Sequence, residues 1–333
     1  MTENIKPGET FFTTDQITSM CQRGFGASVQ LESIHELGGG TFNTAYLITL
    51  TGAHKVILRI APPQTMDTAW EDAFLMRSEH AMQPYFAPLS ALMPKTLLVD
   101  FTHQLIDRDY MFQTFIEGER WDNLWDELSA EENNLLWDEF GKIMKQIHDV
   151  RGESFGLPRP GFQFERWSQT VMDRLDRTLR AAKELRLDAT DLAQILDLVR
   201  AHRGQLDQIQ TPRLLHGDLW AFNLLIGRDE NGPAIVGVLD ADRSWWGDPM
   251  ADWTMFILAH AEPEEGHEHF WRAYGPREDT RGAKFRKTVY DGMHAATALV
   301  YSVRNHDQGT VQRAYGTLRE VAEALPALID QRE

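Results

Sequence analysis

The sequence predicts an α+β protein of two lobes: a small sheet-based N-lobe with one helix, and a larger, mainly helical C-lobe. Two observations carry this prediction. Short runs rich in β-branched and aromatic residues dominate up to about residue 115, and helical patterns dominate after Gly118. The 333 residues, with 42% hydrophobic and 25% charged, suffice for one large domain or two modest ones. We therefore place the N-lobe at residues 1–115 and the C-lobe at residues 116–333.

The expected N-lobe consists of five strands interrupted by one helix. Each strand pattern is bounded by turn signals, which is typical of a small antiparallel sheet. The helix shows an apolar stripe at helical spacing that includes Trp70, Phe74 and Met82. The strands are expected at 29–35, 42–50, 55–61, 96–100 and 110–115, and the helix at about 68–86.

The expected C-lobe begins with a well-marked helix. Ser129 is followed three residues later by Glu132, a capping-box pattern, and the helix runs to about residue 150. Helices are expected again from about residue 250, and a ligand is expected in the cleft between the lobes. Between these parts lie helical patterns at 164–185 and 190–208 and short strands at 214–215, 224–226 and 235–239.

The strongest chemical signal is a pair of β-type runs that each end in polar residues. The first leads into His216-Gly217-Asp218, with Asn223 five residues after Asp218, and the second ends at Asp240. Phosphoryl transfer needs a carboxylate to accept the proton of an attacking hydroxyl, and oxygen ligands to hold Mg²⁺ against the phosphates. We therefore predict Asp218 as the catalytic residue and Asn223 and Asp240 as metal ligands, brought together by a hairpin.

This ordered set resembles the aminoglycoside phosphotransferase / choline kinase family, whose members are small-molecule kinases with a protein-kinase-like fold. The family pattern is His-Gly-Asp, four residues, Asn, a hydrophobic run, Asp and a later Gly-Asp-Pro. The resemblance implies ATP or GTP as co-substrate, Mg²⁺ as cofactor and a hydroxyl as phosphoryl acceptor. The matching residues here are His216-Gly217-Asp218, Asn223, Asp240 and Gly247-Asp248-Pro249, with Asp252 just after.

A glycine-rich stretch lies between the first two strand patterns. Glycines let backbone N–H groups approach phosphates without a Cβ in the way. Judged alone, the stretch fits a plain hairpin turn equally well, and the resemblance places it at the nucleotide phosphates. The residues assigned to this nucleotide contact are Gly38, Gly39, Gly40 and Thr41.

The resemblance assigns two further N-lobe positions to the nucleotide. Arg59, on the third strand, matches the cation that pairs the phosphates, with Lys55 on the same face as a rival. Glu79 is its expected ion-pair partner on the helix; an exposed strand cation and a solvated helix glutamate are the alternatives. Where the fifth strand enters the connector, the carbonyl of Thr114 and the N–H of Ile116 are expected to bind adenine.

Four other polar residues belong to the same constellation. His216 is expected to brace the loop rather than to do chemistry. Asp242 either touches a second metal or the substrate, or is a loop carboxylate, and the sequence leaves both open. Asp248 and Asp252 are expected to be structural, with Asp248 capping the helix that follows it.

The net charge and the composition limit the classes of partner that the protein can have. A net charge of −17 disfavours nucleic acid and anionic membranes, and it suits a cationic small molecule, although acidic surfaces also simply favour solubility. Acidic residues crowd 117–139 and 262–268, where a solvated helix face is an equally good interpretation. We expect a cytoplasmic protein, because the N-terminus lacks a signal-peptide core, no apolar run is long enough to span a membrane and Cys21 is the only cysteine. The oligomeric state is left open.

Within this family an antibiotic phosphotransferase is the leading interpretation, which would make the biological role resistance. Kinases of choline, homoserine, a thio-sugar or a fructosamine are the alternatives, and a nucleotide-binding pseudokinase is a further one. The string His-Gly-Asp-Leu-Trp at 216–220 is similar to fructosamine kinases, whereas Leu239-Asp240-Ala241-Asp242 is closer to the antibiotic kinases. All three polar residues of the predicted centre are present, which argues against the pseudokinase.

Overall fold

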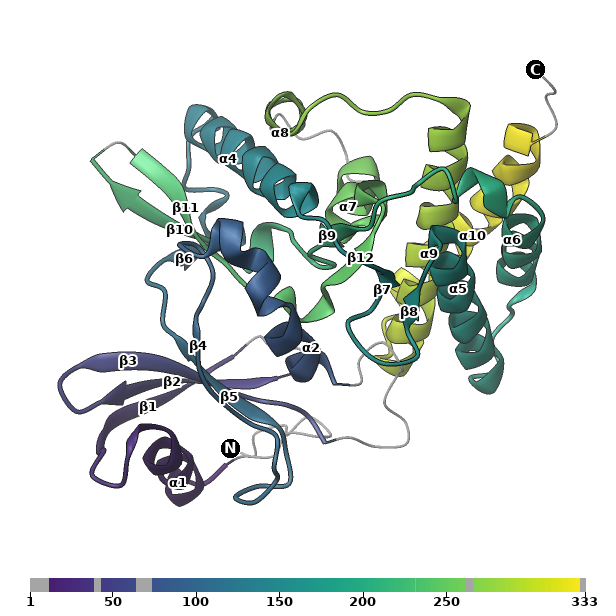
Figure 1. Cartoon of the computed structure of the whole chain (residues 1–333). Coiled ribbons are helices and arrows are strands. Elements are labelled where there is room, and N and C mark those ends of the chain that lie inside the picture. The colour runs from purple at the N-terminus through teal and green to yellow at the C-terminus, as the bar shows by residue number, and fades with distance from the viewer. Residues whose placement is uncertain (1–11, 39–42, 64–73, 231, 261–265, 330–333) are drawn as a thin grey trace.

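The computed structural model describes residues 12–38, 43–63, 74–230, 232–260 and 266–329. In this part of the chain a sheet-based lobe and a larger, mainly helical lobe lie side by side (Figure 1). The chain passes from one lobe to the other between β5 and β6, at residues 115–118. The predicted two-lobed fold is therefore confirmed.

The N-lobe sheet is antiparallel, with strand order β1-β2-β3-β5-β4. Arg59 of the central strand β3 pairs with Ala45 on one side and with Met111 on the other. The apolar residues of the strands form one core, which includes Ile48, Leu58 and Phe112. The strands are β1 Leu31–Leu37, β2 Thr44–Leu50, β3 His54–Ile60, β4 Thr96–Asp100 and β5 Tyr110–Thr114.

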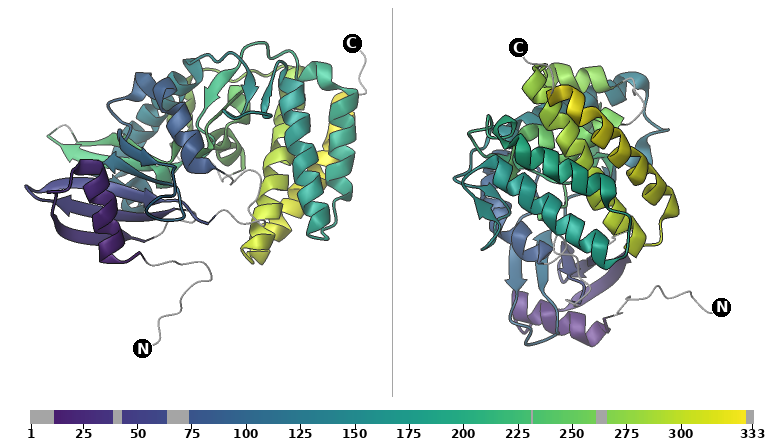
Figure 2. Two further views of the ribbon diagram at one scale, coloured as in Figure 1. Left: turned by 60° about the horizontal axis from the view of Figure 1, so that its bottom comes forward. Right: turned by 90° about the vertical axis from the view of Figure 1, so that its right-hand side faces the viewer.

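A second N-lobe helix, α1 (Thr14–Phe25), was not expected from the sequence. Thr13 and Gln16 form a reciprocal capping box at its start. Its buried face, with Ile17, Met20 and Cys21, packs on the N-lobe core. The helix closes one side of the sheet (Figure 2, left) and leaves the other side to face the C-lobe.

Of the helix expected at about 68–86, residues 68–73 lie outside the described residues, Trp70 among them, and the described part is α-helical as α2 (Leu75–Met82). The chain then continues as the 3₁₀ segment η1 (Gln83–Leu89), because Pro84 has no N–H to donate and a proline clashes with an α-helical turn before it. Met82 and η1 pack into the C-lobe core. The α2–η1 segment therefore connects the two lobes.

Two small sheets form the centre of the C-lobe. One has the order β11-β10-β6 and the other β8-β7-β12-β9. β10 and β11 form the predicted antiparallel hairpin, in which Leu224 pairs with Val238. The strands are β6 Glu119–Arg120, β7 Phe155–Gly156, β8 Gln163–Phe164, β9 Arg213–Leu215, β10 Leu224–Asp229, β11 Gly232–Val238 and β12 Trp245–Gly247.

Helices surround these sheets. The predicted capping box is confirmed at the start of α4, where Ser129 Oγ accepts from the N–H of Glu132 and Glu132 Oε2 accepts from the N–H of Ser129. α5, α6, α9 and α10 pack together at the end of the C-lobe far from the N-lobe (Figure 2). The helices are α3 Trp121–Leu124, α4 Ala130–Asp149, α5 Trp167–Glu184, α6 Thr190–Ala201, α7 Trp253–His260, α8 His267–Tyr274, α9 Arg281–Arg304 and α10 Gln308–Ile329.

Short 3₁₀ segments link the small strands to the loops of the site. They are η2 Arg203–Gln205, η3 Ala221–Asn223, η4 Ala241–Arg243 and η5 Pro249–Ala251. η3 precedes β10 directly and η4 follows the end of β11, and α2 of the N-lobe packs against η4. Of the helices in the described ranges, none combines the length and the apolar character needed to cross a membrane.

Candidate active site

The loop after β9 carries Asp218 and ends in η3 with Asn223. The Asn223 side chain donates through Nδ2 to the main-chain oxygen of Asp218 at 2.7 Å, and lies 3.5 Å from Asp218 Oδ2. The predicted pairing of the two residues is thus a direct contact. Burial raises the pKa of Asp218 to about 7, an effect that nearby Asp240 reinforces and that Arg243 opposes. A carboxyl group with a pKa near neutrality is suited to exchange a proton with a substrate hydroxyl.

The side chain of Asp252 holds this loop in place through hydrogen bonds from main-chain N–H groups. Its carboxylate accepts from the N–H groups of His216 and Gly217, both at 2.8 Å, and lies 3.0 Å from His148 Nε2. The side chain is fully buried. Burial alone would raise its pKa, but the hydrogen bond and charge of His148 and the bonds from the loop lower it below the usual value. Asp252 is structural, as predicted, and it binds the loop that carries Asp218.

Gly217 is required by the shape of the loop. Its φ is +84°, in the left-handed region that side-chain-bearing residues rarely adopt. A Cβ at this position would stand 2.2 Å from the carbonyl oxygen of Arg243. A residue with a side chain at this position would therefore force the two loops apart.

His216 braces the same loop. Its main-chain N–H binds Asp252, its carbonyl accepts from Ser244 Oγ at 3.2 Å, and its ring meets the edge of Phe86 at 5.9 Å between centroids. Burial lowers the pKa of the ring to about 4, so the imidazole is neutral at pH 7. The hydrogen bonds that brace the loop come from the His216 main chain, and the bracing role of the ring stays a prediction.

Asp240 follows β11 in an unusual backbone conformation, with φ 57° and ψ 51°. Strained non-glycine backbone of this kind concentrates at functional positions. The N–H of its neighbour Leu239 donates to the carbonyl of Asn223 at 2.9 Å, so the hairpin brings Asn223 and Asp240 together as predicted. The Asp240 side chain is 48% exposed and opens to solvent.

The chemistry of these donors fits Mg²⁺. Because Asn223 Nδ2 is bonded to Asp218, its amide oxygen is the group left for a cation, and the carboxylate of Asp240 follows from the paired strand. Among the described residues no three His, Cys, Asp or Glu side chains gather as a metal site. One carboxylate and one amide are nevertheless the kind of set that suits Mg²⁺, which takes few protein ligands and completes its shell with waters and phosphates.

A buried ion pair joins β3 to α2. Arg59 Nη1 lies 2.7 and 2.9 Å from the two carboxylate oxygens of Glu79, and Gln113 Nε2 donates to Glu79 at 2.8 Å. Arg59 and Glu79 are each only 8% exposed. The predicted pair is therefore present, and the alternatives of an exposed strand cation and a solvated glutamate are wrong. Gln113 was missed, although a lone amide in the apolar run Tyr110–Thr114 was a usable signal.

Arg59 also reaches across to the C-lobe. Its Nη2 lies 2.8 Å from Asp240 Oδ1 and 3.7 Å from Asp242 Oδ2. Asp242 is buried, and burial together with Asp240 raises its pKa. Of the roles left open for Asp242, the geometry favours a carboxylate that faces Arg59.

The other predicted nucleotide residues are only partly described. Gly38 follows β1, whereas Gly39, Gly40 and Thr41 lie outside the described residues. Thr114 ends β5, where its main-chain N–H donates to the carbonyl of Lys95 at 2.9 Å. Ile116 lies beside Gly237 of β11, at the junction of the lobes. The adenine contacts of Thr114 and Ile116 stay predictions.

Two lobes, a buried strand–helix ion pair and a His-Gly-Asp loop beside an Asn–Asp hairpin define a kinase-like phosphotransferase. The model of the "Phosphotransferase enzyme family" matches residues 33–286, and the chain belongs to this family. The predictions of the family and of an ATP-dependent phosphotransferase are therefore confirmed.

The individual proteins that resemble this chain match it either over part of its length or at low sequence identity. A "Probable ketoamine kinase" of Klebsiella aerogenes is 32% identical over 114 residues, a match that spans 34% of this chain and only 37% of that protein. The crystal structure of a thermostable mutant of the aminoglycoside phosphotransferase APH(4)-Ia has a TM-score of 0.68 at 16% identity, covering 92% of this chain and 98% of the other. A ternary complex of that enzyme with AMP-PNP and hygromycin B has a TM-score of 0.67 at 17% identity, with the same coverage. The structural likeness, at this identity, shows the shared fold.

Proposed function

We propose that the protein transfers the γ-phosphoryl group of ATP to a hydroxyl of a small amine-bearing acceptor of the aminoglycoside type. The observation that carries this proposal is the contact of Asp218 with Asn223, next to Asp240 and across from the buried Arg59–Glu79 pair. The solved complex of APH(4)-Ia with AMP-PNP and hygromycin B supports a nucleotide and an aminoglycoside as the two substrates of this fold. GTP in place of ATP is the alternative co-substrate.

In the proposed reaction Asp218 orients the attacking hydroxyl and accepts its proton. Asn223 and Asp240 would hold Mg²⁺, which neutralises charge on the phosphates when bound. Arg59, oriented by Glu79, contacts the phosphates, and Asp242 limits the freedom of the Arg59 guanidinium. Catalysis then comes mainly from positioning and electrostatics.

The remaining nucleotide contacts come from backbone groups. The stretch from Gly38 through Gly39 and Gly40 to Thr41 offers N–H groups to the phosphates, and the main chain of Thr114 and Ile116 offers an edge to adenine. Support for these roles comes from their order along the chain, which follows the family pattern.

The acidic segment 117–139 supports a cationic acceptor less than its composition suggests. Several of its carboxylates are already paired with cations of the protein: Asp122 with Arg120, Glu132 with Arg228, and Asp138 with Arg272. Glu117, Glu119, Asp126, Glu127 and Glu131 are exposed, and the ion pairs found in the described ranges do not include them. Only these side chains favour an amine-bearing substrate. Glu262, Glu264 and Glu265 of the second cluster lie outside the described residues.

A ketoamine of the fructosamine type is the second candidate acceptor. The match to the Klebsiella aerogenes protein favours it, as does Trp220, two residues after Asp218. The rings of Trp220 and Phe222 lie 4.1 Å apart at an angle of 33°, and Phe222 is 41% exposed. The half-buried Trp220 and the exposed Phe222, close to Asp218 in the sequence, offer a surface on which the apolar face of a sugar can pack.

The test is a coupled assay of ADP release with Mg-ATP and a panel of acceptors. The panel contains aminoglycosides, ketoamines, choline, homoserine and a thio-sugar, with Asp218→Asn as the control variant. Turnover that an aminoglycoside stimulates most supports the first proposal and a resistance role, and a preference for a ketoamine supports the second. Tight ATP binding without turnover on the whole panel would contradict both and indicate a pseudokinase.

A further inference from the structure

The helix that presents Glu79 to Arg59 is short and poorly capped. α2 has eight residues, begins after Phe74 in a left-handed conformation (φ 64°), and has no side-chain hydrogen bond at its N-cap. A helix of this length is not stable on its own, so its position depends on tertiary contacts. Glu79 provides one such contact, through Arg59 and Gln113.

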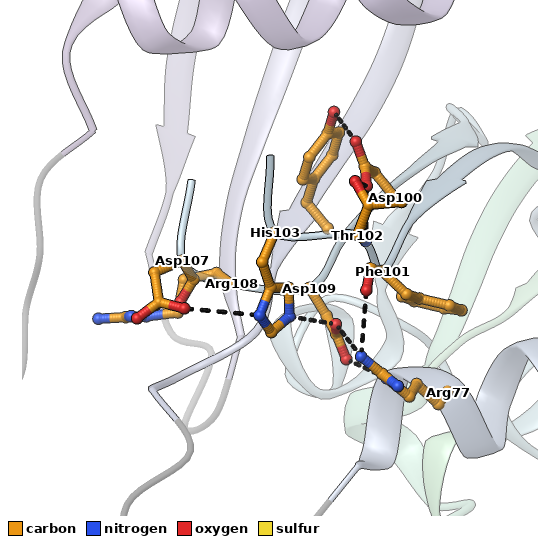
Figure 3. Close-up of polar contacts among 9 residues, drawn as sticks. Arg77, Asp100, Phe101, Thr102, His103, Asp107, Arg108 and Asp109 are labelled. Carbon is orange, nitrogen blue, oxygen red and sulfur yellow. Dashed lines mark hydrogen bonds and ion pairs between the residues drawn. The ribbon is translucent and has the colours of Figure 1, made fainter. Parts of the chain in front are cut away.

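Arg77 of α2 provides a second polar contact with the N-lobe. Its Nε and Nη2 donate to the two carboxylate oxygens of Asp109 at 2.7 and 2.8 Å, and Nη2 lies 3.4 Å from the carbonyl oxygen of Phe101 (Figure 3). The guanidinium also lies over the rings of Phe74 and Phe101, at 5.6 and 5.0 Å. Residues two apart on a helix point to different faces, so Arg77 and Glu79 hold α2 from two directions. A bidentate pair fixes orientation as well as distance.

Asp109 is bonded to α2, which carries Glu79, and to the residue that follows β3, the strand that carries Arg59. Its side chain holds α2, and its carbonyl accepts from the N–H of Ala61 at 2.9 Å, two residues after Arg59 on β3. The carboxylate is 6% exposed and also lies 2.9 Å from His103 Nε2, while His103 Nδ1 is 3.5 Å from Asp107 (Figure 3). Asp109 therefore fixes the position of α2 relative to β3.

The β4–β5 loop that presents Asp109 is itself held at its base. Asp100 accepts from the N–H and Oγ1 of Thr102 at 2.8 and 2.6 Å and from the hydroxyl of Tyr110 at 2.9 Å. Arg23 of α1 adds an ion pair to Asp100 at 2.8 Å. Because both ends of the loop are bonded to the sheet, Asp109 is a fixed reference point for α2.

We propose that Arg77 is a positioning residue for phosphoryl transfer: its bidentate pair with Asp109 sets the orientation of α2, and through it the fit of Glu79 on Arg59. The inference rests on the proposed contact of Arg59 with the nucleotide phosphates. On this inference the β4–β5 loop, through Asp109 and Arg77, also helps to position the Arg59–Glu79 pair.

The test compares Arg77→Ala and Asp109→Asn with a matched control, Arg23→Ala. The control removes an ion pair of similar length, 2.8 against 2.7 Å, to a similarly buried carboxylate at the base of the same loop, but from α1 instead of α2. For Arg77→Ala and Asp109→Asn we expect kcat/KM for ATP to fall about tenfold, with the KM for the acceptor changing less than about twofold. Arg77→Lys should recover only part of the loss, because an ammonium keeps the charge without the fork. Arg23→Ala should lower the melting temperature and change the ATP parameters less than about twofold, because Asp100 keeps its bonds from Thr102 and Tyr110.

Calorimetric titration with Mg-ATP gives a readout that needs no acceptor, at a temperature where thermal unfolding shows every variant folded. Equal ATP parameters for Arg77→Ala and Arg23→Ala would overturn the positioning role. Arg59→Met separates this inference from the proposed function. If Arg59→Met weakens ATP binding and Arg77→Ala does not, only the inference fails; if Arg59→Met changes nothing, both fail.

Discussion

Replacing Asp252 by asparagine tests whether one buried carboxylate shapes the catalytic loop. In the native protein Oδ2 accepts from the N–H of His216 and faces His148, while Oδ1 accepts from the N–H groups of Gly217 and Trp253. An asparagine can present only one oxygen. Whichever way the amide turns, its NH₂ group faces at least one main-chain N–H of the loop, and two donors repel.

The magnitude follows from the number of bonds. One buried N–H loses its partner, which costs about 1–3 kcal/mol, and the bonds that survive lose the charge that strengthens them. We expect Asp252→Asn to lower the free energy of unfolding by about 2–4 kcal/mol. We also expect kcat to fall at least about tenfold, because the loop carries Asp218 and small displacements of a reacting group are costly.

Urea unfolding followed by tryptophan fluorescence measures the first effect, and the ADP-release assay under folded conditions measures the second. Asp248→Asn is the matched control. Asp248 is equally enclosed and binds Arg286 at 3.2 Å, Tyr290 at 2.8 Å and the N–H of Met250 at 3.1 Å, yet it makes none of these contacts with the loop. The Asp248→Asn variant should be less stable than the wild type and should keep the wild-type kcat. An Asp252→Asn variant with wild-type kcat would refute the reasoning.

Three further predictions concern single residues. Gly217→Ala should lower the free energy of unfolding by about 2–4 kcal/mol in urea unfolding, because a Cβ would meet Arg243 and the φ is unfavourable; wild-type stability would contradict the close approach of the two loops. Asp218→Asn should reduce turnover at least about a hundredfold while calorimetry shows Mg-ATP affinity within about twofold of wild type; retained turnover would exclude Asp218 as the proton acceptor. Burial lowers the pKa of His294 to about 3, so the unfolded chain binds a proton that the folded chain excludes between about pH 3 and 6.5. Stability should therefore rise with pH in that window, and His294→Gln should remove up to about 1.4 kcal/mol per pH unit of the slope, whereas an unchanged slope would count against a neutral buried ring.

Local signals in the sequence predicted the parts of the fold that depend on local structure. The capping box at Ser129, the strand Thr96–Asp100 and the hairpin between Asn223 and Asp240 all appear as expected. The capping box of Thr13 and Gln16 is the same kind of local signal, so α1, which was not expected, was within reach of the sequence. The end of α2 at Met82 follows from Pro84, which the apolar stripe alone did not show.

Contacts between distant segments were less predictable. The order of His216-Gly217-Asp218, Asn223 and Asp240 was enough to place these residues together, because a hairpin links them. The bonds from Asp252 to the loop, and from Arg77 to Asp109, join residues 35 and 32 positions apart through elements whose packing no local pattern describes. Asp252 was recognised as structural, but its partners could be identified only from the fold.

The two contacts of Arg59 differ in a way that bears on how the site accepts a nucleotide. Glu79 holds the guanidinium within a buried environment, whereas Asp240 meets it from the other lobe with a half-exposed carboxylate. Water and salt weaken an exposed ion pair far more than an enclosed one. In the proposed function, phosphate oxygens that reach Arg59 therefore compete mainly with Asp240, and the Glu79 contact persists. Asp240, whose contact with Arg59 the phosphates would replace, is also the residue proposed to hold Mg²⁺. We therefore expect the nucleotide and the cation to occupy the site together.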